Sequence, residues 1–138
     1  MAGYLATPLP KKLGIKDGAT VALLAAPNGF ERALTPLPDD VEVRTQARGK
    51  LDVIVFFATR ERELARRFPV MARALQPAGG LWVAWPKKTS CIATDLTFDP
   101  VQEIGLECGL VDNKVCAIDE TWSALRFVYR VADRPGLR

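Results

Sequence analysis

The chain has 138 residues, of which 49% are hydrophobic and 25% charged, and this composition predicts one folded domain with a well-buried core. It contains no histidine, which excludes histidine-based catalytic triads, imidazole acid–base catalysis and histidine zinc ligands within these residues. The net charge of +3 comes from interleaved acidic and basic residues, so it permits an anionic partner without requiring one.

The N-terminal third contains two predicted strands. Residues 1–12 form a lead-in with turn prolines, and we expect this segment to be flexible. The continuous apolar run Ala19–Ala26 predicts a strand that is covered on both faces, as in a parallel sheet. A short helix is predicted over Phe30–Leu34, and the alternating segment Val41–Arg44 predicts a short strand near a sheet edge.

The middle of the chain predicts a strand–helix–strand unit. Asp52–Ala58 and Leu81–Trp85 are apolar runs of strand length, and a turn is expected at Pro77–Gly80 before the second of them. Thr59 is the predicted N-cap of the helix, whose apolar residues recur at helical spacing at Leu64, Phe68, Met71 and Leu75. Pro69 falls inside this stripe and is expected to kink the helix or divide it.

The C-terminal third predicts one more helix and two more strands. Cap residues place the helix over Asp99–Gly109. Lys114–Ile118 and Ala124–Val131 predict strands whose short connection permits only antiparallel pairing, and residues 133–138 are expected to be a flexible tail. About six strands and three helices in alternating order predict a single α/β domain over residues 1–138.

The order of these elements resembles that of the class I S-adenosylmethionine-dependent methyltransferases. Leu13–Val21 resembles the start of the family's first strand, and Asp52–Ala58 resembles its fourth strand. Leu75–Val83 resembles its glycine turn and fifth strand, and Asn113–Arg130 resembles its terminal hairpin. It implies a Rossmann-like three-layer sandwich with a mostly parallel sheet of about six strands. Because only a few residues separate Arg44 from Asp52, it also implies that one βα unit is missing and that a sheet edge lies open beside the cofactor cleft.

Two departures from the family pattern concern the cofactor. The family's first strand ends in an acid and a Gly-x-Gly-x-Gly turn that lets the backbone approach the cofactor, whereas Leu23–Gly29 keeps one of these glycines and Pro27 lacks a backbone N–H. The family's second strand ends in an acid that binds ribose hydroxyls, and Arg44 stands in its place. Arg44 is then either a ligand for a 2′-phosphate or a charge that protects an edge strand from aggregation.

We therefore predict a non-catalytic binding or interaction domain of methyltransferase ancestry that uses no cofactor. The alternative is a reduced methyltransferase that binds S-adenosylmethionine through the Ala25–Gly29 turn in an unusual way. The phrases KKLGIKDG, LWVAWPKK, KVCAIDETWSALRFVYR and ADR are also similar to a family of small bacterial proteins of unknown function, a resemblance that implies no reaction.

Polar loops at the carboxyl ends of the strands supply a candidate ligand site. Ligands of open α/β sheets bind at this edge, and three loops are expected to meet there. They carry the predicted ligand-binding residues Asn28, Gly29, Thr59, Arg60, Lys87, Lys88, Thr89 and Ser90. Cationic side chains, hydroxyls and helix N-termini suit a small phosphate or carboxylate. The alternative is that these loops are polar only because they face water.

The aromatic and sulfur-containing residues favour structural roles. Trp82 and Trp85 are three apart in a strand and are expected to face opposite sides as core residues, whereas Trp122 either shields the hairpin or stacks on a ligand. The cysteines show no CxxC spacing, so Cys91, Cys108 and Cys116 are predicted to be free thiols and no metal is expected. A reactive Cys91 in its polar loop is the alternative.

Partners and location are predicted only in outline. A nucleic-acid partner is not expected, because the arginines over residues 60–73 lack interleaved aromatic residues and the net charge is small. No apolar run reaches the roughly 20 residues of a membrane helix, and the first residues do not read as a signal peptide, so a cytoplasmic protein is expected. A homo-oligomer that pairs through the open sheet edge is a further prediction.

Overall fold

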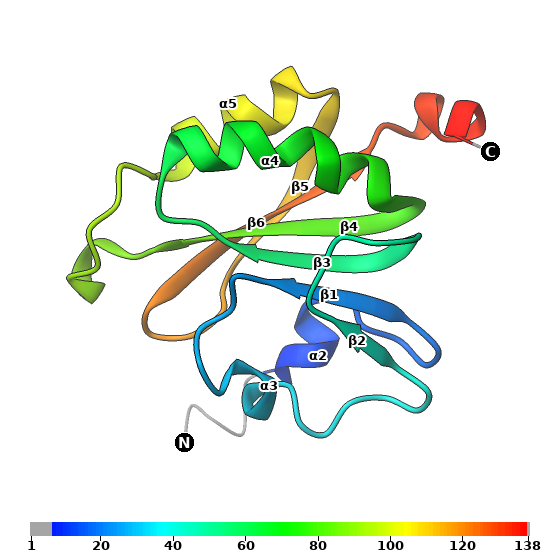
Figure 1. Ribbon diagram of the computed structural model, residues 1–138, viewed down its shortest axis with the longest axis horizontal. Helices are drawn as coiled ribbons and strands as arrows, with labels where there is room; N and C mark the ends of the chain where they lie inside the picture. The colour runs from blue at the N-terminus through cyan, green and yellow to red at the C-terminus, as the bar shows by residue number, and fades with distance from the viewer. Residues whose placement is uncertain (1–6, 138) are drawn as a thin grey trace.

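The computed structural model describes residues 7–137, with side chains described over 7–134, and its centre is a six-stranded mixed sheet (Figure 1). The strands are β1 (Thr20–Leu24), β2 (Glu42–Arg44), β3 (Leu51–Phe57), β4 (Leu75–Pro86), β5 (Leu110–Ala117) and β6 (Trp122–Tyr129). They lie in the order β2-β1-β3-β4-β6-β5, in which the first four are parallel and β6 runs antiparallel to both neighbours. This order confirms the predicted parallel sheet that ends in an antiparallel hairpin.

Helices cover both faces of the sheet and complete the predicted three layers. On one face lie α4 (Glu61–Ala74) and α5 (Phe98–Glu107), and on the other lie α2 (Leu9–Lys12) and α3 (Phe30–Ala33) (Figure 1). The central strands β3 and β4 are buried on both sides, which explains why their sequences are continuous apolar runs. Among the residues that the structure describes, no helix is long and apolar enough to cross a bilayer.

All three tryptophans are buried in the core. Trp82 packs on the side of α2 and α3, and Trp85 packs on the side of α4 and α5, as expected for residues three apart in one strand. Trp122 meets Phe57 edge to face with ring centroids 5.0 Å apart, so its indole belongs to the core beneath the hairpin.

The predicted turn at Pro77–Gly80 is wrong, because these residues lie within β4. The register between β3 and β4 shifts between Leu51 and Val53, where β4 bulges. At Gly79 the two backbones come so close that a Cβ would lie 2.8 Å from the carbonyl oxygen of Asp52. Gly79 therefore allows β3 and β4 to approach each other closely and does not form a turn.

Tertiary packing also overrides two other local signals. The helix α4 runs unbroken from Glu61 to Ala74, so of the two outcomes predicted for Pro69 the division is wrong, and the kink stays a prediction. Buried Leu64 and Phe68 hold the helix against the sheet on that side. The strand β5 begins at Leu110, before its predicted start, because the polar residues that follow pair with β6.

The two ends of the chain are described in part. Residues 1–6 and 138 lie outside the described residues. Within the lead-in, Leu9–Lys12 is helical, and two 3-10 helices, η1 (Lys88–Ser90) and η2 (Val131–Leu137), follow β4 and β6. The flexibility expected for both ends stays a prediction.

Candidate ligand site at the carboxyl edge of the sheet

The carboxyl ends of β1, β3 and β4 lie at one edge of the sheet, on the left of Figure 1. The segments that leave this edge are Ala25–Gly29, Thr59–Arg60 and Lys87–Thr97. Because parallel strands deliver their loops to the same edge, segments far apart in sequence become neighbours there. This edge therefore contains all eight residues that the sequence predicts for a ligand site.

The turn after β1 carries bulky or constrained residues at two of the three glycine positions. Ala25 adopts a φ of 56° and Gly29 a φ of 80°, both in the left-handed region. An alanine in this conformation costs about 1–2 kcal/mol relative to a right-handed one. Pro27 and Asn28 between them are exposed, and Leu23, at the acidic position of the family pattern, is 4% exposed in the core. The turn keeps the left-handed backbone conformation of a glycine-rich loop, but two of the three glycine positions carry side chains.

The Arg44 guanidinium is held by its own strand and by the segment that follows. Nε donates to Oε2 of Glu42 at 2.6 Å, and Nη1 donates to the carbonyl oxygen of Arg48 at 2.8 Å. The hydrogen bond from Arg44, with its positive charge, lowers the pKa of the Glu42 carboxyl. The strand β2 is the edge strand beside β1, so Arg44 is a charge on a sheet edge, as one of the two predictions for it required.

The N-terminus of α4 is capped by the loop that follows β4. The Glu61 N–H donates to Oδ1 of Asp95 at 2.7 Å, and the Thr94 hydroxyl donates to the carbonyl oxygen of Thr59 at 2.7 Å. Thr59 was predicted as the N-cap, but Arg60 occupies that position and the accepting carboxylate is that of Asp95. The loop after β4 therefore closes over the end of β3 and satisfies one of the free N–H groups expected to attract an anion.

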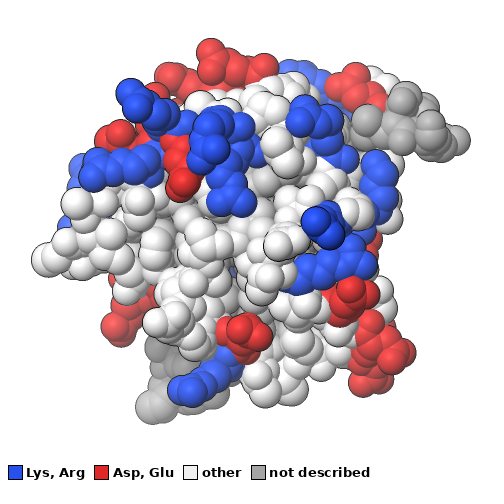
Figure 2. Space-filling model, viewed as in Figure 1, with Lys and Arg blue, Asp and Glu red and all other residues white. Residues whose placement is uncertain are grey.

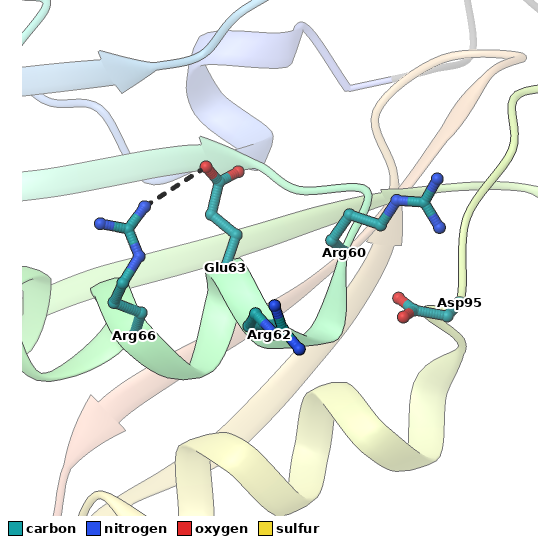
Figure 3. A pocket seen from close by; sticks show the side chains of 5 residues that line it. All are labelled: Arg60, Arg62, Glu63, Arg66 and Asp95. Carbon is teal, nitrogen blue, oxygen red and sulfur yellow. Dashed lines mark ion pairs between the residues drawn. The ribbon is translucent and has the colours of Figure 1, made fainter.

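A hollow of about 520 Å³ opens where this loop meets α4 (Figure 3). It is lined by Arg60, Arg62, Glu63, Arg66 and Asp95, and Arg66 lies 3.6 Å from Glu63 in an exposed ion pair. Figure 3 shows Arg60 extending from the start of α4 toward the segment that carries Asp95. Lysine and arginine side chains spread over the surface formed by α4 in Figure 2, but two carboxylates lie within this hollow itself.

A second hollow, of about 640 Å³, lies between the end of β4 and the start of α5. Its apolar part includes Trp85 and Phe98, whose ring centroids are 6.5 Å apart, and its rim carries Lys87 and Lys88. The turn is rigid because the Ser90 N–H and hydroxyl both donate to the carbonyl oxygen of Lys87, at 3.0 and 2.7 Å. The two ion pairs found among the described side chains involve neither lysine. An apolar floor with two unpaired ammonium groups suits an amphipathic anion.

The structure divides the predicted residues among three places. Lys87 and Lys88 share the second hollow and Arg60 lines the first, whereas Asn28 and Gly29 are exposed on the β1 turn, outside both. Thr59, Thr89 and Ser90 lie beside these hollows in the chain but line neither of them. Sequence reasoning missed most of the lining of the second hollow, which also includes Trp85, Cys91, Thr94, Thr97, Phe98 and Ser123. The three cysteines are free, and of these Cys91 is exposed.

Replacing Asp95 with alanine is expected to lower the free energy of unfolding by about 1 kcal/mol, because α4 loses its capping acceptor. The Asp95→Asn variant keeps an acceptor oxygen and is expected to lose less. Urea unfolding followed by circular dichroism measures both. An alanine variant as stable as the parent would show that the cap contributes nothing.

No protein-family model matches this chain, and no curated protein matches its sequence. Among the described residues, no group of three or more cysteine or acidic side chains is placed to hold a metal ion.

Solved structures that are similar to this chain include methyltransferases. A ribosomal protein L11 methylase from Lactobacillus delbrueckii subsp. bulgaricus has a TM-score of 0.62 at 13% identity, over 88% of this chain and 75% of that one. Magnesium protoporphyrin IX methyltransferase from Synechocystis, solved with bound S-adenosylmethionine, scores 0.59 at 10% identity, over 88% and 74%. An S-adenosylmethionine-dependent methyltransferase from Aquifex aeolicus scores 0.55 at 16% identity, over 91% and 95%. The chain therefore has the Rossmann-like fold of S-adenosylmethionine-dependent methyltransferases.

Proposed function

We propose that this protein is a non-catalytic ligand-binding domain of methyltransferase ancestry that has lost the methyl-donor site. The observation that carries the proposal is the end of β1, where Ala25 and Pro27 stand at two of the three glycine positions. Proline has no N–H to offer a ligand, and the side chains fill space that a cofactor needs next to the backbone.

Two further substitutions support the loss of the donor site. Leu23 is buried and apolar at the acidic position of β1, so it offers no acceptor at the sheet edge. Arg44 carries a positive charge at the position of the ribose-binding acid, and its guanidinium already donates to Glu42 and to the Arg48 carbonyl. A ribose would meet donors where it needs an acceptor.

The ligand that the domain binds is a small amphipathic anion, in the hollow at the end of β4. Lys87 and Lys88 would hold its carboxylate or phosphate, and the apolar surface of Trp85 and Phe98 would cover its apolar part. The volume of about 640 Å³ lies within the range of small-molecule sites.

The Lys87→Ala/Lys88→Ala double variant tests this site. We expect it to lose at least tenfold in affinity for an aromatic carboxylate such as benzoate, because each charged contact contributes roughly 1.5 kcal/mol or more. The matched control is Arg32→Ala/Lys50→Ala, which removes the same charge from exposed positions elsewhere. Equal binding by both double variants, measured by calorimetry, would contradict the site.

A reduced methyltransferase is the second candidate function. The left-handed φ of Ala25 favours it, because the turn has kept the backbone path that a glycine would take. In that case the donor would lie over Ala26 and Asn28, and calorimetry with S-adenosylmethionine distinguishes the two functions.

A homo-oligomer through the open edge is proposed as a separate property. The outer edge of β2 is unpaired within the described residues, and the strand spans only Glu42–Arg44. Light scattering that shows a monomer at high concentration would count against it.

A further inference from the structure

A separate basic hollow lies on the α2 side of the sheet, away from the edge described above. It encloses about 190 Å³ between the end of α2, the edge strand β5, and β6. Among the described residues, its lining consists of Lys11, Lys12, Leu13, Gly14, Trp82, Asn113, Lys114 and Arg126, which include four cations and no carboxylate. None of them belongs to the ligand site proposed above.

Arg126 lines this hollow from β6, where its guanidinium lies against β4 at a glycine. It is paired across the strands with Trp82, so both side chains extend from the same face. The guanidinium lies over Gly80, where Cζ and Nη2 are 2.7 Å from the position that a Cβ would take. The missing side chain of Gly80 is what allows the guanidinium to lie flat against β4.

The positive charge of Arg126 has no negative partner within the described part of the chain. Its one side-chain hydrogen bond goes from Nη1 to Oδ1 of Asn113 at 3.4 Å, although a guanidinium has five N–H donors. Of the side chains that the structure describes, those in the two ion pairs within 4 Å do not include Arg126. Burial lowers the pKa of Arg126, and the nearby charge of Arg134 lowers it further. Half-buried charges are normally paired, so a bound anion would stabilise the charged form of Arg126.

Two lysines bring further charge to the same rim. Lys12 Nζ donates to the carbonyl oxygen of Ala117 at 3.2 Å, and Lys114 Nζ donates to the carbonyl oxygen of Lys12 at 3.4 Å. Both ammonium groups act on Cys116: burial raises the pKa of its thiol, and the two lysines partly offset that rise. Carbonyl oxygens thus fix these cations in place without neutralising them.

A neighbouring hollow of about 410 Å³ shares Gly14 and Arg126 with the first but has a mixed lining. It contains Lys16 and Gln76, and also the carboxylates of Asp17 and Asp52. Asp52 accepts the Thr20 N–H at 2.8 Å, and Asp17 accepts the Asp39 N–H at 3.1 Å. These carboxylates would repel a second anionic group and would accept hydrogen bonds from hydroxyl or amino groups.

We infer that the smaller hollow binds the phosphate group of a phosphate monoester, whose polar organic part extends into the larger one. The planar fork of Arg126 matches phosphate oxygens, and the rim lysines add positive charge to the same hollow. The smaller volume is too small for most whole ligands but accommodates a phosphate group. A bisphosphate is disfavoured because its second phosphate would meet Asp17 and Asp52.

Titration with inorganic phosphate, followed by amide NMR spectra of isotope-labelled protein, tests the inference. We expect saturable shifts at Gly14, Asn113 and the Arg126 Nε–H. Arg126→Gln is expected to weaken binding about tenfold or more, and Lys114→Ala, at an exposed position, about threefold. The Lys87→Ala/Lys88→Ala variant is the control, because it alters the other site and is expected to leave these shifts unchanged.

Several results would overturn the inference. Shifts that do not saturate at tens of millimolar phosphate would mean that there is no site. Equal affinity in the parent and in Lys114→Ala, with shifts that centre on other residues, would mean that phosphate binds elsewhere. Because Lys114 is exposed, its variant answers the question even if Arg126→Gln does not fold.

Discussion

Replacing Trp82 with alanine is expected to lower the free energy of unfolding by about 3–5 kcal/mol, which is a large share of the stability of a domain this size. Trp82 is fully buried in β4, on the face covered by α2 and α3. Its Nε1–H donates to the carbonyl oxygen of Leu13 at 3.0 Å, so the same side chain also anchors the segment after α2 to the sheet. The Trp82→Ala change therefore creates a cavity and also leaves the buried carbonyl oxygen of Leu13 without its donor.

The Trp82→Phe variant separates these two contributions. Phenylalanine fills most of the cavity but cannot donate a hydrogen bond, so we expect a loss of about 1–3 kcal/mol. Urea unfolding gives the free energies, and hydrogen exchange of the amides near Leu13 is expected to accelerate in both variants. A Trp82→Ala protein within about 1 kcal/mol of the parent would contradict the packing described for this face.

Replacing Gly105 with alanine is expected to lower the free energy of unfolding by about 2 kcal/mol, although alanine is the better helix former by about 1 kcal/mol. Gly105 is buried in α5 against β6. A Cβ there would lie 2.5 Å from Cδ1 and 2.6 Å from Cζ of Phe127. The Phe127 ring cannot retreat easily, because it meets Phe68 of α4 edge to face at 5.2 Å.

A control on the same helix and a double variant make this prediction specific. Glu103→Ala changes an exposed position of α5 and is expected to alter the free energy of unfolding by no more than about 0.5 kcal/mol. Phe127→Leu combined with Gly105→Ala is expected to cost less than the sum of the two single changes, because the smaller side chain makes room for the Cβ. Additive losses would show that the clash does not exist.

The sequence predicted the layers well because each central strand is buried on both faces. Runs such as Asp52–Ala58 have no polar alternation, and this pattern is typical of a parallel sheet between two helical layers. The predictions that were wrong concern positions where distant segments meet. Gly79 read as a turn because the close approach of β3 cannot be seen in the sequence of β4.

The candidate site was predicted less completely, because it also forms where segments distant in sequence meet. Lys87 and Lys88 stand out as charges after a strand, but the aromatic floor beneath them comes partly from Phe98, in a helix that begins later in the chain. The cap of α4 joins Glu61 to Asp95 across 34 residues, and no local signal marks that pair. Sequence patterns predict the edge at which a ligand would bind, whereas the tertiary structure decides which side chains share a hollow.

Isothermal titration calorimetry with S-adenosylmethionine and S-adenosylhomocysteine tests the loss of the donor site most directly. Because Ala25, Pro27 and Arg44 stand where the family pattern has two glycines and an acid, we predict no saturable binding of either molecule below about 1 mM. Saturable micromolar binding of either one, with a stoichiometry near one per chain, would contradict the proposed function and favour the reduced methyltransferase.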